Sequence, residues 1–317
     1  MTQGLDPKEG KARDGQTVRG WIPFPRETEY QTDIKAVSSS PQYNNLDRPD
    51  SDIRSVYYEQ KVAGTQIPFF TMEYEFVRKG IFNRMDPAMA AEYGDDAAFT
   101  EFTKEEAPHI VFTPELKYLT HLIIGKETNP CIKAKKIYDW ICDNTVYSYA
   151  REYSTILNIP MYVYENRYGD CGQEALFFIT LCRIAGVPAA WRSGWECMGG
   201  DRYGMHDWTS VYIKPWGWVP ADPYMGVWAI QESTLPDEDR QYLRDFYFGS
   251  MDPWRLEANA RNNAELNPEK YDFRSEPVDF QRGEVEVDGA NLYFNEFRRK
   301  MSLTVVDDAS TSPSGTR

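Results

Sequence analysis

The sequence predicts an α+β fold in which a small antiparallel β domain precedes a core helix packed on an antiparallel sheet. Three observations lead to this prediction. Residues 70–76 alternate between apolar and polar side chains, which is typical of a half-buried strand. Residues 168–186 contain a capped and almost wholly apolar helix. The strand-like segments between residues 187 and 222 are not separated by helices, which disfavours a doubly wound parallel sheet.

The first third of the chain is predicted to be mainly β. Residues 1–14 are polar and are expected to be loose. Between residues 15 and 82, short extended segments are closed by Pro, Ser or Gly, which we interpret as a small antiparallel β domain. Residues 83–112 are acidic and irregular, and they are expected to run across the surface as a connector. The β-rich N-terminal unit with its connector is therefore assigned residues 15–112.

Two helices are predicted at the start of the core domain, which is assigned residues 113–300. Each begins with a polar N-cap followed by proline, at Thr113–Pro114 and at Asn129–Pro130. Gly125 ends the first of them. The second places apolar side chains on one face, as expected for a helix that covers a core.

The stretch YGDCGQEALFFITLCRIAG, residues 168–186, predicts the central helix. Asp170 is a good N-cap, so Cys171 becomes the first helical residue. From Ala175 to Ala185 the side chains are apolar on nearly all sides, which indicates a buried helix. Gly186 then ends it.

The last part of the core domain is less regular. Residues 187–222 contain three strand-like segments separated by turns. Residues 223–270 are rich in aromatic and acidic side chains, and we interpret them as an insertion that is either a flap over a cleft or a surface subdomain with its own small core. Residues 301–317 are predicted to form a disordered tail because of their composition.

Composition restricts the function classes. The chain of 317 residues is 41% hydrophobic and has a formal net charge of −14. It can therefore bury a core, but phosphate backbones and anionic membranes would repel it, so nucleic-acid binding is disfavoured. No apolar stretch approaches the length of a membrane span. Spacings typical of nucleotide, zinc or calcium sites are not found, so neither a cofactor nor a metal is expected.

Cys171 is the candidate nucleophile. A nucleophilic cysteine must be a thiolate, and the positive end of a helix dipole with its unpaired N–H groups favours that anion. Cys182 lies in the apolar part of the same helix and is predicted to be an inert core thiol. Cys131 and Cys142 fall on one helix, too far apart to bridge each other, and Cys197 lies in a loop. Five cysteines leave at least one thiol unpaired within the chain.

His206 and Asp222 are the candidate partners of this thiol. His206 opens one predicted strand and Asp222 ends the next, so antiparallel pairing would make them neighbours. Taken alone, a cysteine at a helix start, a histidine before a strand and an aspartate before proline each more often have a structural role. Their joint occurrence, on elements of the right type, favours a nucleophile, a general base and an orienting carboxylate.

The segments YGDCGQEALFFITLCRIAGVPA, HDWTSVYI and GWVPADP together resemble the transglutaminase-like superfamily, over about residues 115–225. The resemblance implies a papain-like core, with Cys171 as nucleophile, His206 as general base and acid, and Asp222 as the residue that orients the imidazole. The β domain with its WIPFPR segment is similar to a bacterial branch often attached to exported multidomain proteins. Ser210 and Ala190 depart from the family pattern, so substrate preference does not follow from it.

The oxyanion of such a reaction needs two hydrogen-bond donors. One should be the backbone N–H of the nucleophile. The resemblance implies an aromatic N–H or O–H as the second, for which Tyr147, Tyr149 and Tyr153 remain alternatives. Trp208 is a further candidate, although we rather expect it to pack under His206.

The predicted activity is acyl transfer from an amide through a thioester. A hydrolase of peptidase or amidase type is favoured, with a peptide, protein or glycopeptide as substrate. The alternatives are a protein-crosslinking transglutaminase and a non-catalytic module that binds a glycan or peptide on the same fold. Residues 1–16 contain no apolar signal-peptide core. We favour an exported mature fragment, periplasmic or at the cell surface, over a cytoplasmic protein.

Overall fold

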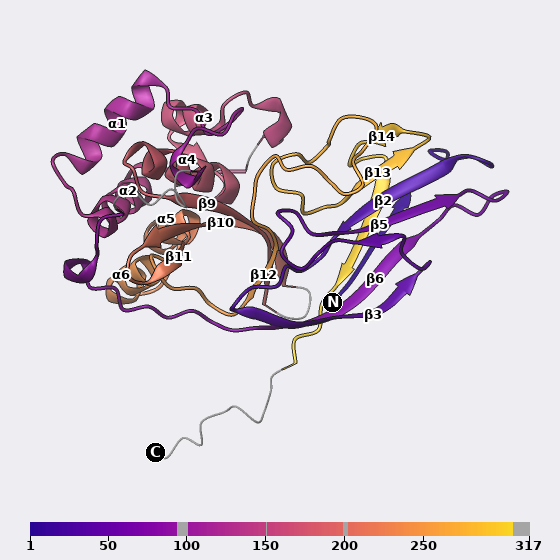
Figure 1. Cartoon of the computed structure of the whole chain (residues 1–317), viewed down its shortest axis with the longest axis horizontal. Helices are drawn as coiled ribbons and strands as arrows, with labels where there is room; N and C mark the ends of the chain where they lie inside the picture. The colour runs from indigo at the N-terminus through magenta and orange to yellow at the C-terminus, as the bar shows by residue number, and fades with distance from the viewer. Residues whose placement is uncertain (94–100, 150, 199–201, 307–317) are drawn as a thin grey trace, which may run out of the picture.

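The computed structural model describes residues 1–93, 101–149, 151–198 and 202–306. Figure 1 shows helices gathered around one sheet on the left and two further sheets on the right. The described residues therefore combine helices with mainly antiparallel sheets, and they do not follow the regular strand–helix alternation of a doubly wound parallel sheet. The predicted α+β fold class is confirmed.

The β part consists of two antiparallel sheets with a shared core. Their strand orders are β15–β1–β6–β3 and β14–β13–β2–β5–β4. The bounds are β1 Thr2–Pro7, β2 Thr17–Pro23, β3 Gln31–Ser40, β4 Asn45–Leu46, β5 Ser55–Lys61, β6 Phe70–Arg78, β13 Glu284–Val287, β14 Ala290–Leu292 and β15 Phe297–Ser302. Phe70 stacks on Tyr58 with ring centroids 5.0 Å apart. Gly20 of the facing sheet makes room for this ring, since a Cβ there would lie 2.6 Å from it.

Two predictions for the ends of the chain are wrong. Residues 1–14 are not loose as a whole, because β1 lies between β6 and β15 and is mostly buried. The core domain does not continue to residue 300, because β13, β14 and β15 pair with N-terminal strands. Both errors have one cause, since these partners lie far apart in the sequence and a local pattern carries no information about them. Of the predicted tail, residues 307–317 lie outside the described residues, and Met301 and Ser302 belong to β15.

The second part of the chain is built on the antiparallel sheet β11–β10–β9–β12. Its strands are β9 Ala189–Cys197, β10 Tyr203–Ile213, β11 Gly217–Ala221 and β12 Arg255–Asn259. The helices of the described ranges are α1 Pro114–Ile124, α2 Pro130–Asn144, α3 Ile159–Asn166, α4 Cys171–Ile184, α5 Pro223–Gln231 and α6 Asp237–Phe246. Helix α4 packs on β9 and β10 and is surrounded by α1, α2, α3 and α5. The short strands β7 Val146–Tyr147 and β8 Tyr168–Gly169 pair in parallel just before α4.

The predicted helix starts are confirmed. The side chain of Thr113 accepts a hydrogen bond from an N–H of the first turn of α1, and Asn129 does the same for α2. At α4, Asp170 and Gln173 form a capping box, in which each side chain binds the other residue's backbone N–H. Gly186 has a φ of 76°, a conformation that favours glycine after a helix end.

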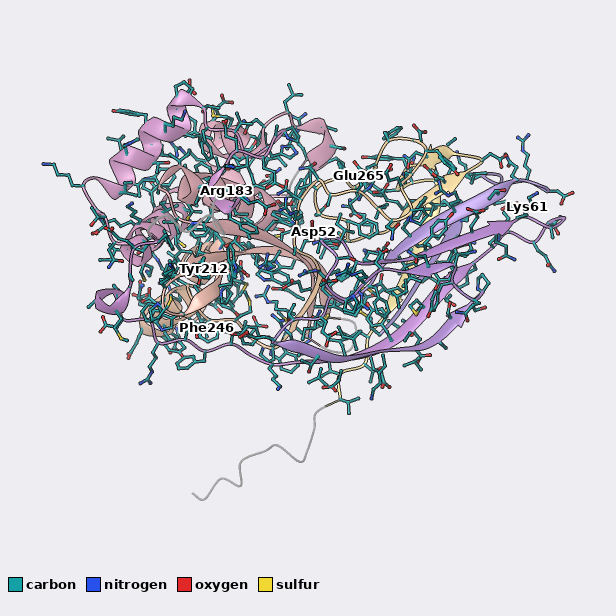
Figure 2. The ribbon with its side chains drawn as sticks, viewed as in Figure 1. Asp52, Lys61, Arg183, Tyr212, Phe246 and Glu265 are labelled. Carbon is teal, nitrogen blue, oxygen red and sulfur yellow. The ribbon has the colours of Figure 1, made fainter. Side chains whose placement is uncertain are left out.

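Helix α4 is buried almost completely, as its sequence predicted. Only its first and last residues, Cys171 and Ile184, keep partial exposure. Near its end, the Arg183 guanidinium is buried and donates hydrogen bonds to the carbonyl oxygens of Ala189 and Lys104. Figure 2 labels Arg183 within the helical part. Within the described residues, no helix combines the length and the apolar character that crossing a membrane would need.

The segment 223–270 forms α5, α6 and the edge strand β12. It contributes Met225, Tyr247 and Met251 to a small hydrophobic cluster that also contains Trp208 and Ile81. This arrangement fits the interpretation as a subdomain with its own small core. The cavity beside Cys171 is lined instead by residues from the loop 275–282, so the segment is not a flap over it.

Candidate active site

The candidate nucleophile lies at the N-terminus of α4. Its N-cap Asp170 accepts hydrogen bonds from the backbone N–H of Gln173 (3.1 Å) and from the hydroxyl of Tyr153 (2.5 Å). As the first residue of the helix, Cys171 has an N–H without an intrahelical acceptor, and no other acceptor for it is found among the described residues. The Cys171 side chain is partly exposed and its thiol is free.

His206 and Asp222 lie together, as their positions in the sequence suggested. Strands β10 and β11 pair antiparallel with Thr209 opposite Ala221, so Asp222 follows β11 beside the start of β10. The distance from His206 Nε2 to Asp222 Oδ2 is 2.7 Å, and both side chains are buried. Asp222 is also the N-cap of α5, because its Oδ1 accepts a hydrogen bond from the Met225 N–H.

A buried arginine stabilises this pair, and sequence analysis missed it. Arg255 of β12 is 1% exposed, and its Nη1 lies 3.3 Å from Asp222 Oδ2. Burial opposes ionisation of Asp222, but the charges of His206 and Arg255 outweigh this cost and lower the pKa of the carboxyl below its ordinary value. The sequence gives a weak signal, an arginine between apolar residues of a strand, but it does not reveal the partner.

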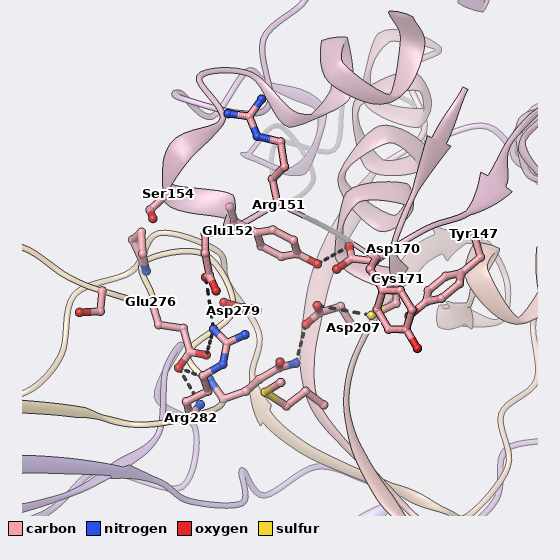
Figure 3. Close-up of a pocket in the computed structure, with 16 residues that line it drawn as sticks. Tyr147, Arg151, Glu152, Ser154, Asp170, Cys171, Asp207, Glu276, Asp279 and Arg282 are labelled. Carbon is pink, nitrogen blue, oxygen red and sulfur yellow. Dashed lines mark hydrogen bonds and ion pairs between the residues drawn. The ribbon is translucent and has the colours of Figure 1, made fainter. Parts of the chain in front are cut away.

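The thiol itself contacts a different carboxyl group, that of Asp207 (Figure 3). Cys171 Sγ lies 3.8 Å from Asp207 Oδ2. The Gln281 side-chain amide donates to Asp207 Oδ1 (2.8 Å) and to the His206 carbonyl oxygen (3.0 Å). A Cβ at Gly172 would lie 2.6 Å from Asp207 Oδ2, so the glycine permits this close approach. Sequence analysis singled out neither Asp207 nor Gln281.

These carboxyl groups oppose ionisation of the thiol. Burial raises the pKa of Cys171 well above its ordinary value, and the charges of Asp207 and Asp170 add to that effect. The expectation from the helix N-terminus considered only the favourable dipole, and it omitted these neighbours. Both effects favour the protonated form of the thiol.

No direct hydrogen bond joins Cys171 to His206 within the described ranges. Successive side chains of a strand point to opposite faces. Asp207 therefore faces the start of α4, while His206 faces Asp222 and the ring of Tyr224. The charge of Cys171 nevertheless raises the pKa of Tyr224, after the larger effect of burial. The structure thus brings together His206 with Asp222, and Cys171 with Asp207.

The oxyanion candidates divide into two groups. Tyr147, Tyr149 and Tyr153 line a cavity of about 300 Å³ that also contains Cys171. The Tyr153 hydroxyl is already bound to Asp170, and the Tyr149 side chain is 91% exposed. Trp208 does not line this cavity. It is buried and stacks on the His206 ring, with centroids 6.0 Å apart.

The cavity wall is rich in charged side chains. The carboxyl-bearing residues on it are Glu152, Asp170, Asp207, Glu276 and Asp279. Arg151 and Arg282 provide positive charges. The loop 275–282 contributes a large part of this wall, and its role was not predicted. In the part of the chain that the structure describes, no group of three His, Cys, Asp or Glu side chains could hold a metal ion.

Comparisons with known proteins relate part of the chain to a known family. Residues 117–223 match the model of the Transglutaminase-like superfamily. An uncharacterized protein of Haemophilus influenzae is 23% identical over 307 residues, which cover 85% of this chain and 80% of the relative. The uncharacterized protein YebA of Bacillus subtilis is 27% identical over 123 residues, or 33% of this chain and 17% of YebA. The chain therefore corresponds to less than a fifth of YebA.

A solved structure supports the fold along nearly the whole chain. The structure of a proposed cysteine protease from Cytophaga hutchinsonii superimposes with a TM-score of 0.53 at 16% identity, covering 97% of this chain and 94% of that one. At this identity the likeness concerns the fold alone. The matched segment 117–223 contains α4 together with β9, β10 and β11, that is, the elements on which Cys171, His206 and Asp222 lie. The part of the chain that bears the three candidate residues therefore matches the transglutaminase-like superfamily.

Proposed function

We propose that the protein is a thiol-dependent amide hydrolase of peptidase or amidase type, which forms a thioester on Cys171. The observation that supports this most directly is the buried pair of His206 and Asp222 with a 2.7 Å contact, beside the helix start that bears the thiol. A carboxylate bound to one imidazole nitrogen fixes the tautomer and stabilises the imidazolium. Because Nε2 faces Asp222, Nδ1 is the nitrogen that remains for the thiol.

The reaction has two halves. His206 Nδ1 takes the proton of Cys171, and the sulfur attacks the amide carbon of the substrate. The tetrahedral intermediate collapses when the imidazolium gives this proton to the leaving nitrogen, so an amine departs and a thioester remains. A water molecule, deprotonated by His206, then attacks the thioester. Carboxylic acid is released, and the proton returns to the thiol.

The resting contact with Asp207 sets a condition on this mechanism. The thiol must rotate about its side-chain bond from Asp207 towards His206 before the proton can be transferred. The N–H of Cys171 is the proposed first oxyanion donor, since it has no acceptor among the described residues. Tyr147, Tyr149 and Tyr153 remain alternatives for the second. The substrate class and an exported location stay predictions of the sequence.

The thioester can be tested without knowing the substrate. We would incubate the protein with p-nitrophenyl acetate, measure p-nitrophenolate release and locate the acetyl group by peptide mass spectrometry. We expect acetylation at Cys171, and a loss of about 10²–10⁴-fold in rate for His206→Ala, the usual contribution of general acid–base catalysis. His121→Ala is the matched control, because His121 is exposed on α1 and does not line the cavity that contains Cys171.

The result can also contradict the proposal. If Cys171 is not acetylated, or if His206→Ala reacts as fast as the wild type, then the thiol and imidazole do not work together. A non-catalytic binding module would then be the better interpretation. Adding glycinamide during turnover separates hydrolysis from transamidation, because only the latter yields more acetylglycinamide than the direct reaction of glycinamide with the ester in a protein-free control.

A further inference from the structure

The cavity beside Cys171 contains more carboxyl groups than positively charged groups, and some carboxyl oxygens lack a strong hydrogen-bond donor. We call it the Cys171 cavity, and its carboxyl-bearing residues are Glu152, Asp170, Asp207, Glu276 and Asp279. In Figure 3, Asp170 and Asp207 lie next to Cys171, whereas Glu152, Glu276 and Asp279 lie further from it, near Arg282. Among the described lining residues, two side chains are positively charged, Arg151 and Arg282. The question is which substrate group such a cavity would accept.

Asp207 is the carboxyl group closest to the nucleophile. Its side chain is 2% exposed, so it is shielded from bulk water. Oδ1 accepts a hydrogen bond from the Gln281 amide, and Oδ2 contacts the thiol, a weak donor, at 3.8 Å. The Ser193 side chain also interacts with this carboxyl group. Among the described residues, no lysine or arginine forms an ion pair with Asp207. A buried carboxyl oxygen without a strong donor is energetically unfavourable.

Glu276 provides a second oxygen of this kind. Its side chain is 2% exposed, and Oε2 accepts hydrogen bonds from the backbone N–H groups of Gln281 (2.7 Å) and Arg282 (2.6 Å). Oε1 has no hydrogen-bond donor. Its nearest positive group is Arg282 Nη1 at 3.5 Å, and that nitrogen is equally distant from Glu152. The arginine is therefore shared and does not satisfy Oε1.

The carboxyl groups also act on one another. Burial, with a smaller contribution from the charge of Asp170, raises the pKa of Asp279 to about 6, against the lowering effect of Arg282. Burial raises the pKa of Asp207 well above its ordinary value, and the charges of Asp279 and Asp170 add to this. A positive charge bound between them would relieve this repulsion. The described acidic side chains are not grouped closely enough for a metal ion, which leaves an organic cation.

We propose that the Cys171 cavity binds a primary ammonium group of the substrate, and that Asp207 is the residue that selects for it. An ammonium group offers three N–H donors and one charge, which Asp207 Oδ2 can accept in place of the weakly bound thiol, while Glu276 Oε1 adds a buried acceptor without a donor to the same cavity. The inference rests on the proposed function, since it names the substrate class of the same site. The substrate is then a peptide or amide with a free amino group close to the bond that is cleaved.

Thiol reagents of matched size test this without a substrate. We would compare Cys171 modification by 2-aminoethyl methanethiosulfonate, which carries an ammonium group, with that by the neutral methyl methanethiosulfonate. Both react with the same thiolate, so the ratio of their rates is independent of the thiol pKa. Glutathione gives the reference ratio. We expect the Cys171 ratio to exceed it by about tenfold or more, as for one charge-assisted hydrogen bond.

Variants assign this preference to the carboxyl group. Asp207→Asn keeps an acceptor for Gln281 but removes the charge, and it should return the ratio to near that of glutathione. Asp239→Asn removes the same charge from an exposed position on α6 and should leave the ratio unchanged. The trimethylammonium reagent, which has charge but no N–H donor, should show a smaller preference. High ionic strength suppresses the general attraction of a chain with a net charge of −14.

A measurement on the wild-type protein tests the inference without any variant that could misfold. It also distinguishes whether the bound ammonium group belongs to an amino terminus or to a lysine side chain. Glycinamide mimics a free amino terminus, and n-butylammonium mimics a lysine side chain. Either should slow the alkylation of Cys171 by iodoacetamide in a saturable way, and the stronger one identifies the source. Potassium chloride at equal ionic strength should not protect.

Some results would overturn the inference. A rate ratio equal to that of glutathione, or one that Asp207→Asn leaves intact, would exclude ammonium selection by Asp207. Absence of protection by both amines would do the same. The ratio does not require His206, so it must persist in His206→Ala. If acetylation fails but the ratio stands, the cavity is an ammonium site without the proposed catalysis. If only the ratio fails, the hydrolase proposal stands.

Discussion

Replacing Arg255 by methionine should strongly destabilise the protein, because it leaves a buried carboxylate without its arginine. Arg255 Nη1 contacts Asp222 Oδ2 at 3.3 Å and Glu196 Oε1 at 3.2 Å, and Nη2 contacts Asp252 Oδ2 at 2.9 Å. Asp222 is 0% exposed and Arg255 is 1% exposed, so water cannot replace the lost charge. Methionine has a similar length and is flexible, which limits the loss of packing.

The expected size of the effect follows from this burial. Breaking a buried ion pair by removing one partner costs about 3–5 kcal/mol, mainly because a charge remains uncompensated. Asp222 keeps its contact with His206, and Glu196 and Asp252 are partly exposed, so we expect the lower end of that range. The double variant Arg255→Met/Asp222→Asn leaves no anion at the centre. It should be more stable than Arg255→Met alone by about 1–2 kcal/mol.

The free energy of unfolding is measured in urea at neutral pH, by tryptophan fluorescence and far-UV circular dichroism in parallel. Coinciding curves justify a two-state treatment. Arg48→Met is the matched control, because Arg48 pairs with Asp50 at the surface, where the two side chains are 81% and 67% exposed. This control should unfold as the wild type does.

Two results would refute the reasoning about Arg255. A loss below about 1 kcal/mol in Arg255→Met would mean that His206 alone compensates the Asp222 charge. Strictly additive effects in the double variant would mean that the two side chains are not energetically coupled. In either case Arg255 would not be the group that keeps Asp222 ionised beside the imidazole.

Two further predictions concern pH. Burial and the charges of Asp207 and Asp170 raise the pKa of the Cys171 thiol, so iodoacetamide should alkylate Cys171 only at a higher pH than it alkylates glutathione. Asp207→Asn should shift the pH profile of this alkylation to lower pH. An unchanged pH profile would contradict the effect of the Asp207 charge. Burial also raises the pKa of Glu174. The folded protein therefore keeps a proton on Glu174 at pH values above about 4.3, where the unfolded chain has lost it. The free energy of unfolding consequently falls as the pH rises. Glu174→Gln removes this penalty, so its stability relative to the wild type should increase from about pH 5 to about pH 8, by at most about 1.4 kcal/mol per pH unit. If urea unfolding gives the same stability difference between variant and wild type at both pH values, this reasoning is wrong.

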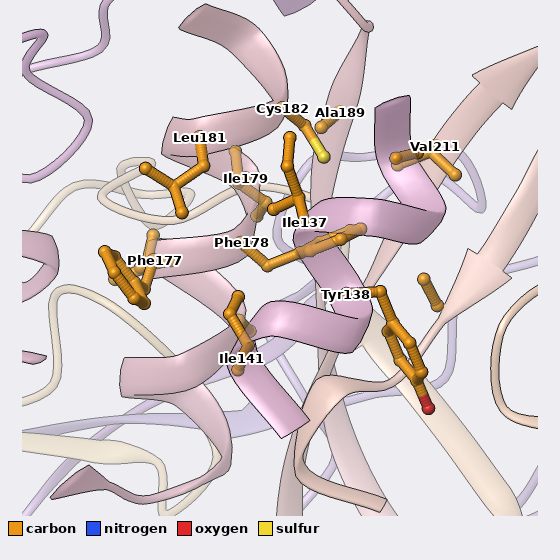
Figure 4. Close-up of a cluster of buried hydrophobic side chains, with 14 of the residues drawn as sticks. Ile137, Tyr138, Ile141, Phe177, Phe178, Ile179, Leu181, Cys182, Ala189 and Val211 are labelled. Atoms are coloured by element: carbon orange, nitrogen blue, oxygen red, sulfur yellow. The ribbon is translucent and has the colours of Figure 1, made fainter. Parts of the chain in front are cut away.

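The parts of the site that sequence analysis predicted depend on short-range interactions. The start of α4 is determined by Asp170 and Gln173, which are three residues apart and bind each other's backbone. Its burial follows from the apolar run after Cys171, and Figure 4 shows that run packed against α2. The approach of His206 to Asp222 requires only that two consecutive strands pair across a short turn. Such interactions leave a readable local pattern.

The missed parts depend on pairings over long sequence distances. Strand β12 brings Arg255 to Asp222 because it pairs with β9, about sixty residues earlier. The loop 275–282 reaches the cavity on the way to β13, and Gln281 meets Asp207 from there. Strand β1 is buried between partners from both ends of the chain. Local residue patterns do not specify any of these contacts, because the sequence of a strand or loop does not reveal which distant segment it contacts.

Asp207 differs from these cases, because the sequence contained enough information to place it. If His206 faces Asp222, the next residue of the same strand must face the other side of the sheet. Helix α4 covers that side, and its first residue is Cys171. Once α4 is placed on that side, the alternation of side chains along the strand implies the contact between Asp207 and the thiol. The same geometry means that a ligand in the Cys171 cavity competes with the thiol for Asp207. A substrate that binds this carboxyl group would free the thiol to turn towards His206, so that substrate recognition and activation of the nucleophile become one event.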